Sequence, residues 1–304
     1  MRTVFTIALL GLAVVTAAPA AQAPRKQNVA HRGASAYAPE HTLAAYRLAL
    51  EQGADFVEQD LAVTRDGVLI CLHDPSLERT TDVEERFPTR FTEITYEGKF
   101  RRVWLANDFT LAEIKTLDAG SWFDAKFAGE RVPTFDEAVA LIRGKAGLYP
   151  ELKTPDIYAG RDVDFPALVE AALDRLKLRG PAADPKTPVI LQTFGESTAR
   201  ALAERKIGVP VVLLFDTRDA FDPAAMVARW KGVVTGFGPA KQVVTKAPEF
   251  VRLAHAAGLT VTPYTFRSAA TPGFDSVDAE MSHFLYTLGV DALFTDNPDK
   301  FPRR

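Results

Sequence analysis

Four short groups of polar residues carry the side chains best suited to chemistry, and each group ends an apolar run. Together they supply two histidines, three carboxylates at metal-ligand positions, an arginine and a lysine, which are the groups needed to cut a phosphodiester with a hard divalent cation. The ordered set carries this prediction, because each short motif alone would be weak. The groups are His31-Arg32-Gly33, Glu58-Gln59-Asp60, His73-Asp74 and Glu151-Leu152-Lys153.

The predicted metal ligands are Glu58, Asp60 and Glu151. Alternate residues of a strand point to the same side, so Glu58 and Asp60 share a face at the carboxyl end of their strand. Buried carboxylates are costly unless a cation neutralises them, and all-oxygen ligation favours Ca²⁺ or Mg²⁺ over zinc. The alternative is that neighbouring arginine and lysine side chains pair with the three carboxylates.

His31 and His73 are the predicted acid and base. Cleavage by an internal hydroxyl needs one group to take the hydroxyl proton and another to protonate the leaving alkoxide. Each histidine stands beside a charged residue, Arg32 or Asp74. We expect Arg32 and Lys153 to bind the phosphoryl oxygens and to stabilise the charge that develops on them.

An alternation of apolar strands and amphipathic helices must position these groups. This alternation is typical of a parallel sheet covered on both faces, and eight strands indicate a single α/β domain with a (β/α)8 TIM barrel. The predicted strands are 28–30, 55–61, 147–151, 189–193, 211–215, 233–237, 260–265 and 292–295. The predicted helices are 42–52, 110–117, 135–142, 165–178, 196–205, 223–230, 248–257 and 278–288.

Two segments depart from the alternation. Residues 64–67 predict a turn and 68–72 the return arm of a hairpin that extends the second strand, although 68–72 could instead count as a barrel strand. An insertion at about 74–108 lacks periodicity and follows His73, so it is either a substrate-shaping lid or a solvated loop. Too few residues follow 292–295 for a full eighth outer helix, which is missing or reduced to a stub.

Residues 1–23 predict a secretory signal peptide. Arg2 precedes an apolar core at 4–15, which is shorter than the roughly 20 residues that span a bilayer. We favour cleavage after Ala20 over cleavage after Ala23, and the alternative is an uncleaved anchor. The barrel domain, 24–304, is therefore expected to be exported, periplasmic or secreted, without stable insertion in a membrane.

The amino-acid composition restricts the class of molecule that the protein is expected to bind. A net charge of −3 gives no basic footprint for nucleic acid, so we expect a small-molecule substrate. The single cysteine, Cys71, lies in an apolar run and excludes an internal disulfide, so the core and any bound metal must supply stability.

The ordered motifs resemble the glycerophosphodiester phosphodiesterase family over nearly the whole stretch from Asn28 to Pro298. A further pair of motifs, in and just after 74–108, is similar to the insertion of the periplasmic bacterial subtype. The family motifs are His31-Arg32-Gly33, Pro39-Glu40-His41-Thr42, Glu58-x-Asp60, His73-Asp74, Glu151-x-Lys153 and Thr295-Asp296-Asn297-Pro298. The subtype motifs are Phe87-Pro88-Thr89-Arg90 and Asp108-Phe109-Thr110-Leu111.

The resemblance implies a barrel that hydrolyses glycerophosphodiesters to an alcohol and sn-glycerol 3-phosphate. It implies Ca²⁺ or Mg²⁺ on Glu58, Asp60 and Glu151. It also implies acid–base catalysis by His31 and His73, with the glycerol hydroxyl attacking to form a cyclic phosphate intermediate.

The chain departs from the family pattern at two places. His41 stands where the family usually has Asn, and Tyr264-Thr265-Phe266-Arg267 replaces a typical Trp-Thr-Val-Asn. We expect Tyr264 and Phe266 to contact the substrate. Both departures bear on the head group rather than on phosphodiester chemistry.

Two other functions compete with this prediction. One is a lysophospholipase D-like or phosphatidylinositol-cleaving enzyme on the same barrel, which the lack of a long apolar rim disfavours. The other is a non-catalytic organophosphate-binding barrel, which the complete set of catalytic groups disfavours.

Overall fold

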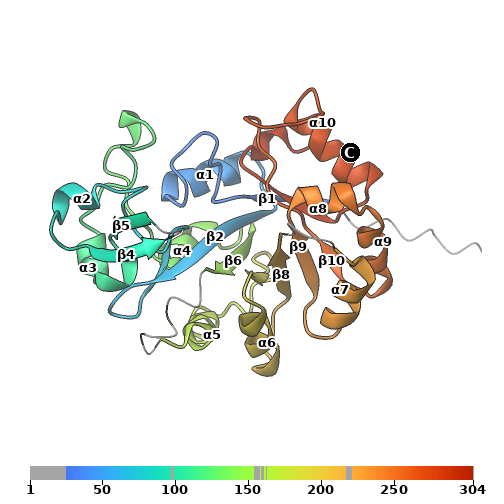
Figure 1. Ribbon diagram of the computed structural model, residues 1–304, viewed down its shortest axis with the longest axis horizontal. Coiled ribbons are helices and arrows are strands. Elements are labelled where there is room, and N and C mark those ends of the chain that lie inside the picture. Colours follow the sequence, from blue (N-terminus) through green and yellow to red (C-terminus); the bar gives the residue numbers. More distant parts are fainter. Residues whose placement is uncertain are drawn as a thin grey trace, which may run out of the picture.

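A computed structural model describes residues 25–96, 99–153, 158, 161, 163–216 and 221–303, so the predicted signal peptide at 1–23 lies outside the described residues. Eight parallel strands form a barrel with helices around it (Figure 1). Within the described ranges, no helix has both the length and the apolar character that crossing a bilayer requires. The strands are β1 Gln27–Ala30, β2 Phe56–Val63, β6 Gly147–Leu152, β7 Leu191–Thr193, β8 Val211–Phe215, β9 Gly236–Pro239, β10 Thr260–Val261 and β11 Ala292–Thr295.

The strand order is that of a barrel and confirms the predicted fold class. Neighbouring strands run β10-β9-β8-β7-β6-β2-β1-β11. The circle is completed between β10 and β11, where the amide of Asp291 donates to the Val261 carbonyl at 3.0 Å and the amide of Phe294 donates to the Pro263 carbonyl at 3.1 Å.

Two strands differ most from their predicted bounds. The amides of Val233 and Val234 both donate to the Trp230 carbonyl, which places them in a turn after the helix that ends at Trp230, so β9 starts later than predicted. β10 is only two residues long, although the amides of Thr262 and Tyr264 still donate to the carbonyls of Phe237 and Pro239 in β9.

Helices follow the strands and cover the outside of the barrel (Figure 1). Several begin at capping residues: the Thr42 hydroxyl accepts from the Ala45 amide, and Thr134 forms a capping box with Glu137. These helices are α1 Leu43–Glu51, α4 Phe135–Ile142, α5 Phe165–Arg175, α6 Glu196–Glu204, α7 Pro223–Trp230, α8 Lys241–Lys246, α9 Glu249–Ala256 and α10 Val277–Ser282.

The last predicted helix, at 278–288, is divided in two. α10 passes into one turn of π-helix, His283–Thr287. After β11 the described chain holds only the short 3-10 helix Pro298–Lys300, in agreement with the predicted stub of an eighth helix.

Side chains alternate between the two surfaces of the barrel strands. Val57 and Leu148 point outward into the main core beneath the helices, whereas Phe56 and Tyr149 point into the barrel, where their rings meet at 5.8 Å. This interior cluster forms the floor of the barrel, and the next inward-facing residues on β2 and β6 are polar.

The second strand extends into a hairpin, as predicted. β3 Leu69–Cys71 pairs antiparallel with β2, and Cys71 is buried opposite Leu61. The insertion that follows is structured, so the expectation of a segment without regular elements was wrong. Its elements are short, which is why periodicity did not reveal them: α2 Val83–Arg86, β4 Thr92–Tyr96, β5 Lys99–Val103 and the 3-10 helix Ala106–Asp108, followed by α3 Leu111–Ile114 and the 3-10 helix Ala125–Phe127.

The insertion has a small apolar core of its own beside the barrel (Figure 1). Leu77, Trp104 and Phe109 are buried in it, and they pack on Ile70 of β3. The hairpin thus connects this core to the strand that carries two of the predicted metal ligands.

Candidate active site

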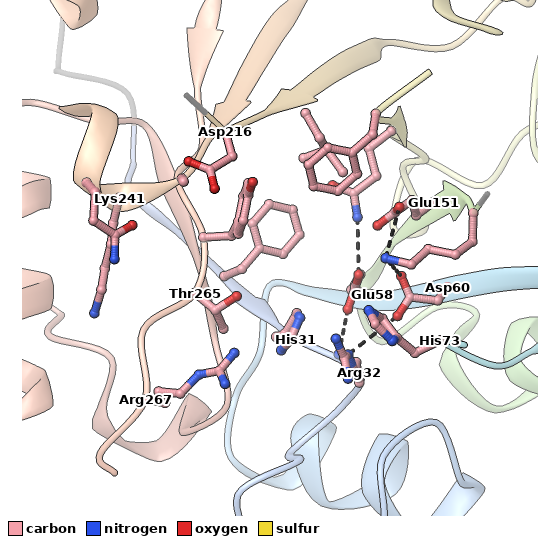
Figure 2. A pocket seen from close by; sticks show the side chains of 18 of the residues that line it. His31, Arg32, Glu58, Asp60, His73, Glu151, Asp216, Lys241, Thr265 and Arg267 are labelled. Atoms are coloured by element: carbon pink, nitrogen blue, oxygen red, sulfur yellow. Dashed lines mark hydrogen bonds and ion pairs between the residues drawn. The ribbon is translucent and has the colours of Figure 1, made fainter. Parts of the chain in front are cut away.

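A cavity of about 450 Å³ opens at the carboxyl ends of the barrel strands (Figure 2). None of the described residues between 74 and 108 lines it, so the insertion does not form a lid over the cavity in this structure. The cavity brings together eight predicted site residues: His31, Arg32, Glu58, Asp60, His73, Glu151, Lys153 and Tyr264.

The three predicted metal ligands lie on neighbouring strands. Glu58 and Asp60 face the barrel interior from β2, and Asp60 is paired in register with Glu151 of β6. One carboxylate oxygen from each lies within 4.8 Å of the others, and all three side chains are buried. The β2–β6 pairing therefore concentrates three acidic groups in one small volume.

Electrostatics make this cluster a site for a cation. Burial, followed by repulsion from neighbouring carboxylates, raises the pKa of Glu58 well above its usual range and that of Glu151 to about 8. Burial also raises the pKa of Asp60, but Lys153 and His41 outweigh it and hold that pKa well below its usual value.

The donor set fits a hard divalent ion. Asp60 Oδ1 is buried without a hydrogen bond, although the Lys153 ammonium lies 3.8 Å away. Gln192 donates to Glu58 Oε1 at 3.3 Å and leaves its own buried amide oxygen without a partner. These unpaired oxygens, with the carboxylates, are the ligand type that Ca²⁺ and Mg²⁺ prefer. Glu58, Asp60 and Glu151 are therefore the residues that would hold such an ion.

The His31-Arg32-Gly33 turn is fixed by its backbone. Arg32 and Gly33 have φ values of +55° and +84°, and the Arg32 amide donates to Glu58 Oε2 at 2.6 Å. A Cβ on Gly33 would lie 2.8 Å from the carbonyl of Ala45, so only glycine fits there. The close approach of α1 thus sets the turn that aims Arg32 at the carboxylates.

His31 is held by a residue that follows the last barrel strand. Its Nδ1 lies 2.6 Å from Asp296 Oδ1, directly after β11, and the other Asp296 oxygen is 3.3 Å from Arg267 Nε. Burial, then the nearby Arg32, lowers the pKa of His31 despite its bond to Asp296. Asp296 fixes the ring orientation and directs the Nε2 atom away from itself.

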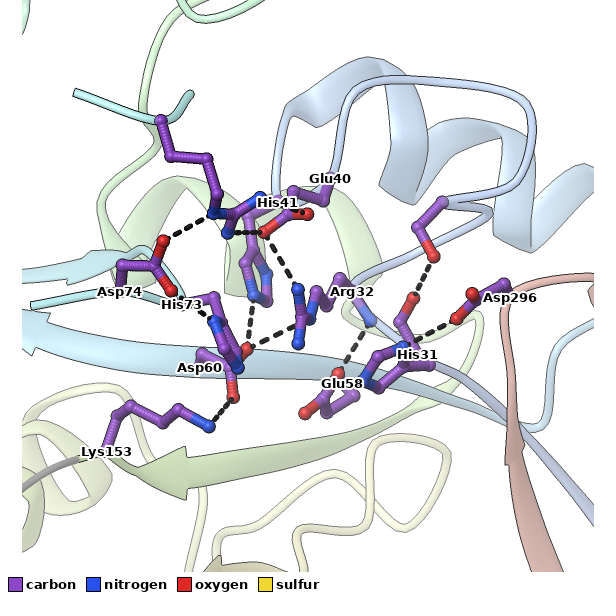
Figure 3. Close-up of polar contacts among 12 residues, drawn as sticks. His31, Arg32, Glu40, His41, Glu58, Asp60, His73, Asp74, Lys153 and Asp296 are labelled. Carbon is purple, nitrogen blue, oxygen red and sulfur yellow. Dashed lines mark hydrogen bonds and ion pairs between the residues drawn. The ribbon is translucent and has the colours of Figure 1, made fainter. Parts of the chain in front are cut away.

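His73 is held by a chain of charges that returns to Arg32 (Figure 3). Its Nδ1 lies 2.7 Å from Asp74, and the guanidinium of Arg79 bonds both Asp74 and Glu40. Glu40 in turn accepts from Arg32 at 3.1 Å, and although burial opposes it, the two arginines lower the pKa of Glu40 to about 2. Arg79 therefore ties both catalytic turns together.

His41 contacts the carboxylate cluster from the side that faces away from the cavity. It is buried at a φ of +60°, with Nε2 2.8 Å from Asp60 Oδ2 and Nδ1 2.9 Å from the Tyr46 hydroxyl. Burial lowers the pKa of His41 even though Asp60 opposes this. The histidine that replaces the family's usual Asn therefore orients Asp60 and does not face the cavity.

The two aromatic residues predicted to contact the substrate occupy different environments in the structure. Tyr264 lines the cavity, whereas Phe266 is fully buried and packs on Phe284 at a ring distance of 4.9 Å. The prediction that Phe266 contacts the substrate is therefore not supported by its place in the core. The regular alternation expected for 260–265 stops with β10 at Val261, so residues beyond it follow no simple pattern.

Several residues of the site lay outside the sequence prediction. Asp296 and Glu40 stood inside the motifs that were recognised, and their charge was the available signal. Arg79 and Gln192 carry no spacing that could mark them. The cavity also includes residues that were not predicted for it: Gln192, Phe194, Leu214, Asp216, Lys241, Thr265 and Arg267.

Comparisons with known proteins agree with this geometry. The glycerophosphoryl diester phosphodiesterase family model matches residues 31–300. A glycerophosphodiester phosphodiesterase of Bacillus subtilis is 34% identical over 283 residues, which cover 90% of this chain and 84% of the relative.

Solved structures show the same fold. A glycerophosphodiester phosphodiesterase of Agrobacterium tumefaciens is 30% identical with a TM-score of 0.66, over 91% of this chain and 98% of that one. A phosphodiesterase of Oleispira antarctica, solved with the product sn-glycerol-3-phosphate, is 26% identical with a TM-score of 0.68, over 91% and 95% of the two chains. On the fold, the site and these matches, the chain is an enzyme that belongs to the glycerophosphoryl diester phosphodiesterase family.

Proposed function

We propose that this enzyme hydrolyses glycerophosphodiesters to an alcohol and sn-glycerol 3-phosphate, with a divalent cation and with His31 and His73 as acid and base. The observation that carries the proposal is the arrangement of the two histidines around three clustered carboxylates (Figure 2). Each histidine has its Nδ1 bonded to an aspartate, which leaves Nε2 for the substrate.

The phosphate would lie between the histidines. Arg32 and Lys153 both line the cavity beside the carboxylates, and Lys153 Nζ is 3.3 Å from Glu151. These two cations bind and orient the phosphoryl oxygens, one by its planar guanidinium and the other as a point charge. Glu58, Asp60 and Glu151 would hold Ca²⁺ or Mg²⁺, which supplies positive charge to the developing phosphorane when bound.

The proton transfers follow from the positions of the two rings. One histidine takes the proton of the glycerol hydroxyl as that oxygen attacks phosphorus, and the other gives a proton to the leaving alkoxide. The product of this step is a cyclic phosphate. Water then opens the ring with the two histidine roles exchanged, which regenerates both protonation states.

Residues 1–23 complete the proposal as an export signal, with the periplasm or the exterior as the site of action. The test is to express the whole chain in a bacterial host and to compare periplasmic and cytoplasmic fractions. Retention of the uncleaved chain in the cytoplasm would contradict this part alone.

The enzymatic test follows release of sn-glycerol 3-phosphate from glycerophosphocholine, with Ca²⁺, with Mg²⁺ and with EDTA. We expect release with at least one of the metals and none in EDTA, and His31→Ala and His73→Ala should be folded and inactive. His255→Ala is the matched control, because His255 lies on α9 and bonds Asp291 away from the cavity. Full activity in chelator, or intact lysolipid cleaved faster than water-soluble diesters, would contradict the proposal.

A further inference from the structure

The cavity continues beyond the phosphate-binding groups to a second surface, which we call the outer wall: Phe194, Leu214, Asp216 and Tyr264. These residues follow or end β7 and β8 or come after β10, so they stand across the barrel mouth from β2. Figure 2 shows Asp216 among the side chains that line the cavity. The outer wall is apolar carbon with one negative charge.

Phe194 is unusual for a residue of its size. Its side chain is 45% exposed at the mouth of the cavity. One edge contact with Tyr264, at a ring distance of 5.7 Å, and the Lys153 ammonium 5.6 Å from its centroid hold the ring in place. An exposed, oriented aromatic ring beside a catalytic site offers its surface to a ligand.

Tyr264 contributes its ring and not its hydroxyl. The hydroxyl donates to the Phe215 carbonyl at 3.2 Å, which anchors the ring and occupies its only proton. The outer wall therefore presents aromatic and aliphatic carbon, with few groups that could satisfy the hydroxyls of a glycerol. Glycerol hydroxyls are better served near the histidines and the carboxylates, where polar partners gather.

The charges around the outer wall leave a negative excess. Three cations of the described residues lie near the outer wall, and each has an acidic partner: Lys241 donates to Glu280 at 2.6 Å, Arg267 lies 3.3 Å from Asp296, and Lys153 lies 3.3 Å from Glu151. Asp216 has no hydrogen bond or ion pair within the described part of the chain. A free carboxylate beside aromatic faces attracts an organic cation and repels an anion.

We propose that the outer wall binds the alkylammonium group of the leaving alcohol, so that the enzyme prefers glycerophosphodiesters whose head group is a cation. Cation–π contact with Phe194 and Tyr264 and attraction to Asp216 would act together on one positive group. This inference rests on the proposed function, and it assigns the substrate class of the same site.

The test compares two diesters of equal shape. Glycerophosphocholine carries a trimethylammonium, and its 3,3-dimethylbutanol analogue carries a neutral tert-butyl group in the same place. We expect a higher kcat/KM for the choline diester. Asp216→Asn should lower its kcat/KM about fivefold and Phe194→Leu about threefold, with little change for the neutral analogue.

A matched variant and a binding measurement complete the test. Glu204→Gln removes the same single charge at the last residue of α6, outside the cavity, and should leave the ratio of the two kcat/KM values unchanged. By calorimetry, choline should bind more tightly than 3,3-dimethylbutanol, and Asp216→Asn should remove the difference.

The two proposals fail in different ways. Turnover of both diesters with equal kcat/KM, or a ratio that Asp216→Asn does not change, would overturn the inference and leave the proposed function in place. Failure to release glycerol 3-phosphate from either diester would overturn the proposed function, and the inference with it.

Discussion

Removing the charge of Glu151 should change how the stability of the metal-free protein depends on pH. Glu151 is buried with a pKa raised to about 8, whereas in the unfolded chain it titrates near 4.5. Between these values the folded protein holds a proton that the unfolded chain has lost. The free energy of unfolding therefore decreases as pH rises through this window, up to the folded pKa.

The size of the effect follows from the pKa. One bound proton changes the free energy of unfolding by about 1.4 kcal/mol per pH unit. Between about pH 6.5 and about pH 8, the deprotonation of Glu151 should therefore lower the free energy of unfolding of the metal-free protein by about 2 kcal/mol. For a domain of this size, that corresponds to a decrease in Tm of about 4–8 °C. Glu58, whose pKa is also raised, adds in the same direction.

The assay is thermal unfolding in EDTA across this pH range. Glu151→Gln should remove the Glu151 share of the slope, and Glu204→Gln, an exposed control, should keep it. Ca²⁺ or Mg²⁺ should flatten the slope in the unsubstituted protein, because a bound cation keeps the carboxylates ionised, and should raise Tm by mass action. Identical slopes for Glu151→Gln and the unsubstituted protein in EDTA would refute this account of the cluster.

Three further substitutions probe other features of the site. Arg79→Ala should lower kcat/KM about tenfold to a hundredfold with little loss of Tm, because it frees both catalytic turns, whereas Arg86→Ala, an exposed arginine of the same insertion, should not. Gly33→Ala should destabilise the fold by about 2 kcal/mol or more in urea unfolding, because its Cβ meets the Ala45 backbone. Phe266→Leu should lower Tm and leave KM unchanged, and a raised KM with normal Tm would place Phe266 at the substrate after all.

The residues that could be predicted from the sequence are those tied to strand ends. Glu58, Asp60 and Glu151 follow the two-residue period of strands, and parallel strands bring their carboxyl ends to one mouth, so their convergence required no knowledge of contacts. The barrel was predictable because its apolar runs alternate with amphipathic helices, such as α5 and α6, that are long enough to show their period.

Long-range contacts between side chains could not be predicted in this way. Asp296 meets His31 from the opposite end of the chain, and Arg79 comes from an insertion whose elements span only three to five residues. Periodicity is blind to elements of that length, and charge alone does not say which partner a residue meets. Phe266 was misplaced because the backbone changes partner just before it: the Tyr264 amide donates to Pro239 of β9, whereas the Phe266 amide donates to Phe294 of β11.

The separate apolar core of the insertion has an evolutionary consequence. Its buried residues pack among themselves and on Ala62 of β2 and Ile70 of β3, in a cluster separate from the main core of the barrel. Among the described contacts, the bonds of Arg79 to Asp74 and Glu40 link this module to both catalytic turns. Selection can therefore reshape the outer face of the module, or lengthen its loops, at small cost to turnover, provided that this one guanidinium stays in place.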